Sequence, residues 1–351
     1  MGIFSHCFGN GSKSAKQPSS SSPVEQLCHR FSLAELKLAT GNFNLGFIGE
    51  DAFGVLYNVL LNNNGTRVVV KRFKKYSMFN GPEMKNEVLL LCQLRHPNLL
   101  SLIGFCEEKN EFIAVYEHTP NGYLRDLLHG GKDKVNPLPW KRRLQICVGV
   151  ARGLHYLHAG ARYAIIHRDL HSQHIFLDEN WEPKIAGLNL SKRGPLSVSR
   201  KLIRVNSRVM GTCGIAEPEY AATGDLTEKV DVFAFGIMLL EIVSAKTPSY
   251  CFMEKNHILE ATLDDEIVDP FLKSKIATEC WEVFIDVTRR CLLEQRVERP
   301  NMGEVEVELE LALRLQEEAD DKIECSISGE DSGAKALTFR TTLSEDSLNN
   351  Y

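Results

Sequence analysis

The chain lacks the sequence patterns of several protein classes. None of its ten cysteines forms a C-x-x-C pair, which argues against a zinc ribbon or a dithiol redox motif. The longest apolar stretch, Val232–Leu240, is too short to cross a bilayer, and no signal peptide or internal repeat is visible. The net charge of −5 argues against a protein that binds nucleic acid through bulk positive charge. These absences favour a cytosolic protein with reduced cysteines, attached to a membrane, if at all, only through its end.

The sequence does contain enough apolar material for a large core, arranged in two different halves. Apolar residues make up 43% of the 351 residues, enough for one large bilobal domain or two small ones. Strand signals dominate the first half, in Phe53–Leu61 and Thr66–Phe73, joined through an Asn-Gly turn, and in Phe112–Tyr116. Helical periodicity predicts the segments Phe31–Leu36 (capped by Ser32), Glu83–Leu94, Leu144–His158, Val230–Val243, Glu279–Leu293 and Gly303–Leu315. This order predicts an α+β fold, with a β-rich N-lobe at about residues 46–118 and a larger helical C-lobe at about 119–316.

Both ends have compositions typical of flexible segments. Residues 1–30 are rich in Ser, Gly and Lys, and residues 317–351 carry nine acidic against three basic side chains, so we expect a flexible tail first and a disordered acidic tail last. Gly2 is exposed once Met1 is removed, and Cys7 is close by, as in doubly acylated proteins. His6 stands where the myristoylation pattern has Ser or Thr. An acylated end and an ordinary flexible start therefore both stay open.

The segment Ile48–Tyr57 is similar to the loop with which protein kinases cover nucleotide phosphates, G-x-G-x-x-G-x-V. Gly49 and Gly54 match the outer glycines, which let backbone amides approach phosphate oxygens. Asp51 replaces the middle glycine. A carboxylate about 4 Å from a phosphate charge costs on the order of 4 kcal/mol at an effective dielectric near 20, an upper limit because Asp51 can turn away. A plain turn between two strands is the alternative interpretation.

Lys71 closes the apolar run Val68–Val70, and a charge there needs a partner. Glu87, on the following predicted helix, is the expected partner, in the ion pair that aligns nucleotide phosphates in kinases. A surface lysine at a strand end fits less well with its place after the Gly-rich loop. We therefore predict that Gly49, Gly54, Lys71 and Glu87 bind nucleotide.

The run His167–Asp178 is the most informative feature of the chain. It is similar to the kinase catalytic loop H-R-D-L-x-x-x-N, in which the Asp is the base and the Asn binds magnesium. Asp169 keeps the base position, whereas His171 stands where Ser/Thr kinases usually have a lysine, and His174 replaces the asparagine. Gly187 replaces the metal-binding carboxylate of D-F-G. Magnesium prefers oxygen ligands and phosphoryl transfer depends on the metal, so these losses predict an idle Asp169 and little or no activity.

Two alternatives stay open at this loop. A displaced carboxylate such as Asp178 or Glu50 could restore metal binding and leave a weakly active Ser/Thr kinase with Asp169 as its base. The three histidines of the run could instead gather around zinc, but no cysteine or carboxylate completes a recognisable pattern. Tolerated substitutions are the simpler interpretation, so no bound metal is predicted.

The residues that hold a kinase scaffold together are present. The run Glu217-Pro218-Glu219 resembles the A-P-E that ends an activation segment, and Glu219 is expected to pair with a buried Arg299. Asp231 is expected to accept hydrogen bonds from the catalytic-loop backbone. A chain that keeps these residues while it loses metal ligands has retained the fold for another use.

The segment after Gly187 is basic and offers four hydroxyl groups, on Ser197, Ser199, Ser207 and Thr212. Arg168 is the residue that would pair with a phosphate in this segment. Phosphorylation that orders the segment and a solvated basic loop are equally consistent with the sequence. Arg168 and the four hydroxyl residues are our regulatory candidates.

Over about residues 31–316, the chain resembles the receptor-like (Pelle-type) kinases of plants. Phe31–Asn44, Leu94–Cys106 and Pro120–Leu124 follow that family, and Arg299–Glu317 is similar to its FERONIA-like subgroup. With no ectodomain or membrane helix, the nearest type is a receptor-like cytoplasmic kinase, and such proteins are often held at the plasma membrane by N-terminal acylation. The stretch Thr247–Asp269 is short for the family, so an altered helix of the C-lobe is expected there.

The departures at Asp51, His171, His174 and Gly187 place the chain, by resemblance, with the family's pseudokinases. The resemblance implies an adaptor at the inner face of the plasma membrane whose partner is a receptor kinase or an immune receptor, without nucleic acid. If ATP binds, the expected contacts are Lys71, Gly49 and Gly54, without magnesium. The alternative is the weakly active kinase described above.

Overall fold

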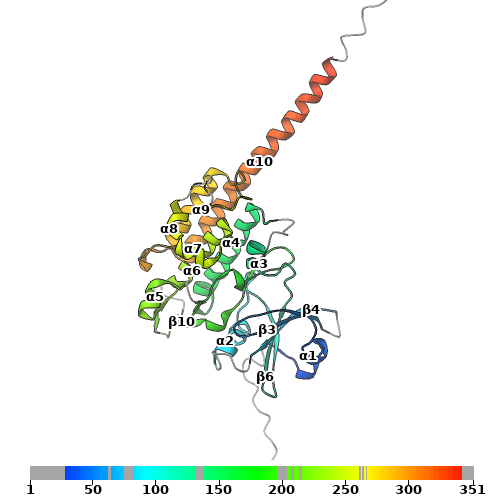
Figure 1. The fold of residues 1–351 in the computed structure, drawn as a ribbon, viewed down its shortest axis with the longest axis vertical. Coiled ribbons are helices and arrows are strands. Elements are labelled where there is room, and N and C mark those ends of the chain that lie inside the picture. Colours follow the sequence, from blue (N-terminus) through cyan, green and yellow to red (C-terminus); the bar gives the residue numbers. More distant parts are fainter. Residues whose placement is uncertain are drawn as a thin grey trace, which may run out of the picture.

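The computed structural model describes residues 28–341, apart from 62–64, 75–81, 131–136, 197–203, 207–208, 213–215, 261, 263–264 and 266. A lobe built on a β-sheet is followed along the chain by a larger lobe built mainly of helices (Figure 1). The predicted α+β bilobal architecture is confirmed. Gly2 and Cys7 lie outside the described residues.

The N-lobe contains one six-stranded sheet. Its strands are β1 (His29–Arg30), β2 (Phe47–Glu50), β3 (Gly54–Leu60), β4 (Arg67–Phe73), β5 (Leu102–Glu108) and β6 (Glu111–Glu117). They lie in the order β1-β5-β6-β4-β3-β2, and all neighbours are antiparallel except β1 and β5. The predicted β3–β4 pairing and the strand at β6 are confirmed, whereas β1, β2 and β5 were not predicted.

The alternation of side chains along β4 determines where Lys71 points. Val68 and Val70 pack in one cluster with Leu36 of α1 (Leu33–Ala39), which begins with the predicted Ser32 cap. Val69 belongs to the cluster on the opposite face, which includes Val88 of α2 (Pro82–Leu91) and continues into the second lobe. Because successive strand residues face opposite sides, Lys71 shares the face of Val69 and points toward the space between the lobes.

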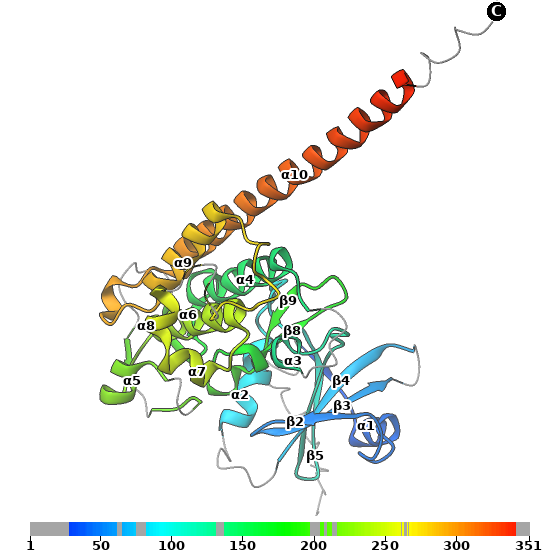
Figure 2. The same cartoon turned by 45° about the horizontal axis from the view of Figure 1, so that its top comes forward.

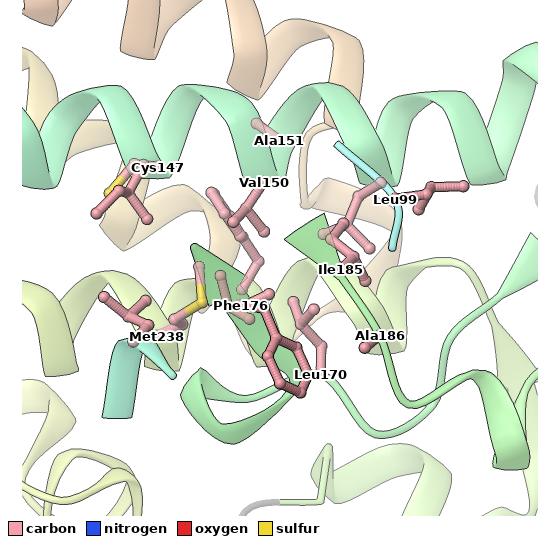
Figure 3. Close-up of a cluster of buried hydrophobic side chains, with 14 of the residues drawn as sticks. Leu99, Cys147, Val150, Ala151, Leu170, Phe176, Ile185, Ala186 and Met238 are labelled. Carbon is pink, nitrogen blue, oxygen red and sulfur yellow. The ribbon is translucent and has the colours of Figure 1, made fainter. Parts of the chain in front are cut away.

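The C-lobe is organised around the buried helix α6. Its helices are α3 (Leu124–His129), α4 (Trp140–His155), α5 (Pro218–Thr223), α6 (Lys229–Ser244), α7 (Pro248–Met253), α8 (Lys255–Glu260), α9 (Thr278–Cys291) and α10 (Met302–Thr341). Short antiparallel pairs join β7 (Tyr163–Ile166) with β10 (Lys192–Leu196), β8 (Ile175–Leu177) with β9 (Pro183–Ile185), and β11 (Arg204–Asn206) with β12 (Asp225–Thr227). The loop of residues 167–174, here called the histidine-rich loop, connects β7 to β8. Figure 3 shows Leu170 and Phe176, from this loop and β8, among buried side chains of α4, α6 and β9.

One of two notable segments in the C-lobe differs from expectation. Helix α10 continues to Thr341 and extends away from the lobes (Figure 2), although composition predicts a disordered tail from residue 317. Its first half is anchored on α4 and α9, and an anchored helix grows without a new nucleation cost. The stretch Thr247–Asp269, where we expected an altered helix, contains the two six-residue helices α7 and α8.

Eight of the ten cysteines lie in the described residues, and of these only Cys325 is exposed. Seven are buried in the core: Cys28, Cys92, Cys106, Cys147, Cys251, Cys280 and Cys291. Burial raises the pKa of Cys106 to about 11 and that of Cys291 to about 12, so these thiols stay protonated at neutral pH. None of the described helices is long and apolar enough to cross a membrane.

Candidate functional site

A buried lysine lies at the centre of the space between the lobes. The Nζ atom of Lys71 is 2.8 Å from Oδ2 of Asp51, 3.6 Å from Oε2 of Glu87 and 3.4 Å from Oδ1 of Asn189. The predicted contact between Lys71 and Glu87 is therefore present. Burial alone would lower the pKa of Lys71, but Glu87 and Asp51 outweigh it and raise the pKa above its ordinary value. The ammonium group is charged and already has two carboxylate partners.

Glu87 also ties helix α2 to both lobes. Its Oε1 accepts a hydrogen bond from the backbone N–H of Gly187 at 2.9 Å, and its Oε2 accepts one from the hydroxyl of Tyr116 at 2.9 Å. The neighbouring Asn86 donates to three carbonyl groups of the segment 188–191. No motif pointed to Tyr116 or Asn86, because their partners are brought near only by the packing of separate elements.

The Gly-rich loop between β2 and β3 turns Asp51 inward. One carboxylate oxygen of Asp51 accepts the N–H groups of Phe53 and Gly54 at 2.8 and 2.7 Å. A Cβ atom on Gly54 would lie 2.7 Å from the carbonyl oxygen of Arg72, so this position requires glycine. Asp51 therefore does not point outward, the orientation in which its charge would lie away from a bound phosphate.

An interlobe cavity of about 520 Å³ opens beside these residues. This volume is in the range of small-molecule sites. Its lining combines apolar side chains, among them Leu56, Val69 and Phe176, with Lys71 and residues of the histidine-rich loop. Of the predicted nucleotide-binding residues, Gly49, Lys71 and Glu87 line the cavity, whereas Gly54 supports it through the N–H group that binds Asp51.

Asp231, at the start of α6, holds the backbone of the histidine-rich loop. Its two carboxylate oxygens accept the N–H groups of His167 and Arg168 at 2.7 and 2.8 Å, as predicted. The Nε2 atom of His158 lies 2.8 Å from Oδ2. Burial would raise the pKa of Asp231, but the hydrogen bond and charge of His158, with the loop N–H groups, hold it below its ordinary value. The loop is therefore anchored by an ionised, fully buried carboxylate.

The substitution Asp231→Asn tests this anchor. One acceptor oxygen becomes an NH₂ group, which leaves a buried backbone N–H without an acceptor and should lower the free energy of unfolding by about 2–4 kcal/mol. Because the folded-state pKa is depressed, the contribution of Asp231 is present above the ordinary aspartate pKa and is lost as the pH falls through the folded value. Urea titrations should therefore show a smaller difference between the two proteins at about pH 3 than at about pH 7. A difference that grows toward acid pH would contradict the assignment.

Asp169 lines the cavity and lies among hydrogen-bonding side chains. Its Oδ1 accepts a hydrogen bond from the hydroxyl of Thr212 at 2.6 Å, and Oδ2 is 3.8 Å from Nε2 of His171 and from Nδ1 of His174. Burial would raise the pKa of Asp169, but the nearby His171 and His174 rings and the Thr212 hydroxyl outweigh it and lower the pKa. The Asp169 carboxylate is thus ionised, and Thr212 of the activation segment holds it in place.

His174 and Gly187 occupy complementary space. The Nδ1 atom of His174 is 2.7 Å from the carbonyl oxygen of Asp169, which fixes the ring. Gly187 has φ of 79°, and a Cβ atom there would lie 2.5–2.6 Å from three atoms of the imidazole. Burial and the neighbouring His171 lower the pKa of His174 to about 3, so its ring is neutral at physiological pH. The two departures from the kinase pattern are therefore sterically linked.

Comparison with known families identifies the fold. A profile described as protein tyrosine and serine/threonine kinase matches residues 45–309. The chain belongs to the protein tyrosine and serine/threonine kinase family. Kinase-family membership indicates that the interlobe cavity is an ATP-type site.

The relatives of this kinase-family chain are plant receptor-like kinases. It is 40% identical over 327 residues to receptor-like protein kinase FERONIA of Arabidopsis thaliana. The aligned region covers 90% of this chain and 36% of FERONIA. It is 42% identical over 305 residues to receptor-like protein kinase ANXUR2 of the same plant, covering 84% of the chain and 35% of that protein. The predicted resemblance is confirmed as homology. The chain spans about a third of the length of these relatives.

The residues present do not fit the magnesium of other kinase domains. That ion is held by an Asn and an Asp carboxylate, and here the first position is an imidazole fixed to a carbonyl and the second has no side chain. The carboxylates considered as displaced ligands have other partners: Asp178 binds two N–H groups of its own turn and Lys184, and Glu50 lies 3.6 Å from Lys74. The geometry therefore offers no replacement oxygen ligand among these residues.

The side chains that do gather are not the three histidines. Ligand atoms of Asp169, His171 and His174 lie within 4.8 Å of one another. His167 is instead fully buried, with its Nε2 bonded to the carbonyl of Ala186 at 2.8 Å. The absence of a bound metal remains a prediction.

The activation segment is described only in part. Ser197, Ser199 and Ser207 lie outside the described residues. Arg168, which has φ of 73° and is buried, donates to the carbonyl of Leu190 at 2.9 Å and to the hydroxyl of Tyr220 at 2.6 Å. Its expected pairing with a phosphate, and the regulatory role of Thr212, remain predictions.

The ion pair that ends the activation segment differs from the predicted one. Arg299 lies 3.0 Å from the carboxylate of Glu217, not from Glu219. Glu217 is fully buried and also pairs with Arg296 at 2.8 Å. The half-exposed Glu219 pairs with Arg296 alone, at 2.9 Å. Because Glu217 precedes α5, its carboxylate turns back to cap the helix at Tyr220 and faces the core, whereas Glu219 in the first turn faces outward.

Proposed function

We propose that this kinase-family chain is a catalytically impaired signalling adaptor. The observation that carries the proposal is the fit of the His174 ring over Gly187, which removes both metal-binding positions together. The scaffold contacts of Asp231 and Glu217 are kept, so a stable kinase fold remains available for binding other proteins. In this function, Asp169 is idle.

The relatives support a partner class for this adaptor. Because FERONIA and ANXUR2 are named receptor-like protein kinases, a receptor kinase is the proposed partner, with the activation segment as the surface that it phosphorylates or contacts. Acylation of Gly2 and Cys7 would place the adaptor at the inner face of the plasma membrane.

A weakly active Ser/Thr kinase is the alternative function. The contact between Lys71 and Glu87 and the presence of Asp169 at the base position favour it, because both are parts of working kinases. The two functions predict different outcomes for one substitution, Asp169→Asn.

The test is incubation of the purified chain with ATP and either magnesium or manganese, followed by intact mass spectrometry. We expect no added phosphate on the wild type or on Asp169→Asn, with an active kinase domain as the positive control for the reagents. Phosphate on the wild type but not on Asp169→Asn would overturn the adaptor proposal and establish the alternative. If the chain is an adaptor, substitutions on the surface of the activation segment should impair its function in cells more than Asp169→Asn does.

A further inference from the structure

A carboxylate of the chain itself occupies the Lys71 ammonium and two loop N–H groups beside the interlobe cavity. Asp51 accepts two backbone N–H groups of the Gly-rich loop with one oxygen and contacts the Lys71 ammonium at 2.8 Å with the other. The backbone carbonyl of Asp51 also accepts a hydrogen bond from Lys74 at 2.9 Å. The side chain is thus held at three points and from both sides of the β3–β4 hairpin.

The donors that hold Asp51 are those with which the kinase fold binds nucleotide phosphates. The loop amides cover the phosphates and the strand lysine pairs with them in that family. We infer that Asp51 is a built-in anion that takes the place of a nucleotide phosphate, so the cavity binds an adenine nucleoside and added phosphates contribute little to its affinity. The inference rests on the proposed function, because it treats the cavity as a ligand site that does not serve phosphoryl transfer.

The charges around the cavity support this assignment. Lys71 is the only lysine or arginine among the described lining residues, and it already contacts Glu87 as well as Asp51. The lining includes six carboxylate side chains: Glu50, Asp51, Glu87, Glu117, Asp126 and Asp169. Burial alone would raise the pKa of Asp51, but Lys71 and the loop N–H groups hold it below its ordinary value, so the carboxylate is ionised. A triphosphate would therefore have to displace one anion and approach several others.

The apolar part of the cavity lining suits an uncharged aromatic ring. Leu56 and Val69 of the sheet, Phe176 of the second lobe, and Tyr116 and Ala186 all line the cavity. Apolar walls of this kind gain free energy from burying a base whether or not it carries phosphates. The cavity thus offers apolar side chains for a base, whereas its phosphate donors are already occupied by Asp51.

The experiment measures the affinities of adenosine, ADP and ATP by calorimetry, with and without magnesium, for the wild type and for Asp51→Gly. We expect wild-type dissociation constants for adenosine and ATP to agree within about threefold, because the phosphates find their donors occupied. Asp51→Gly restores the glycine of the kinase pattern, and it should tighten ATP binding by about tenfold or more while adenosine changes by less than about twofold. Thermal melting of each protein confirms that it is folded.

Glu50→Gln is the charge-matched control. It removes one negative charge from the same loop, but its carboxylate contacts Lys74 and none of the three donors, so ATP binding should change by less than about threefold. Wild-type preference for ATP over adenosine of about tenfold, equal effects of the two substitutions, or no ligand binding by any variant would each overturn the inference. Asp169-dependent phosphate transfer would overturn the proposed function instead, and it is read in a separate assay.

Discussion

Glu217→Ala should be among the most destabilising substitutions in this protein. The Glu217 carboxylate lies between the buried side chains of Arg296 and Arg299, at 2.8 and 3.0 Å, and caps α5 at the N–H of Tyr220. Its removal leaves two cations in the core without this partner, which costs about 3–5 kcal/mol, and also removes a cap worth about 1 kcal/mol. Equilibrium unfolding in urea should show this loss as a lower midpoint with an unchanged slope.

Glu219→Ala is the matched control, because it removes the same group two residues away. The Glu219 side chain is 44% exposed and pairs with one arginine, so its loss should cost about 0–1 kcal/mol. If Glu219→Ala were the more damaging of the two, the pairing expected from the kinase pattern would be correct and the observed arrangement of Glu217 would not.

Gly187→Asp, which restores the residue of the kinase pattern, should harm the protein by itself. The new Cβ would lie within 2.6 Å of the His174 ring in a backbone with φ of 79°. Because overpacking and a left-handed conformation each carry a penalty, we expect a loss of about 2–3 kcal/mol in the free energy of unfolding. Differential scanning calorimetry of the purified variant measures the effect.

The double variant His174→Asn with Gly187→Asp separates steric linkage from simple damage. An asparagine lacks the ring that is fixed to the Asp169 carbonyl, so it can turn away from the new side chain. His174→Asn by itself should cost about 1 kcal/mol, and the double variant should recover about half or more of the loss caused by Gly187→Asp. Strictly additive losses would show that the two positions are independent and would remove the main support for the proposed function.

The elements were predictable where one face of each repeats with a simple period. The β3–β4 hairpin and helices α4, α6 and α9 follow from alternation and from 3.6-residue periodicity. The short helices α7 and α8 and the paired strands of the C-lobe were not predicted, because six or fewer residues carry too little pattern. The extension of α10 beyond residue 317 was not predicted, because it depends on the packing of the first half of the helix and composition carries no information on that packing.

The candidate site was predictable wherever a motif has a constant spacing. Lys71, Asp169, His174 and Gly187 were located from the sequence because the kinase pattern sets their order along the chain. The orientation of Asp51 was not, since a short acidic side chain can point toward solvent or toward donors with little change in the backbone. Only the position of Lys71 on the neighbouring strand makes the inward orientation favourable.

By itself, the sequence determined the two-lobed kinase fold and the loss of both metal-binding side chains, because periodicity and residue identity are local properties. The tertiary structure decided which side chains contact one another. It placed the His174 ring over Gly187, and it paired Arg299 with Glu217 rather than with Glu219. These outcomes depend on distances between segments that lie far apart in the chain, and such distances are set by how the core packs.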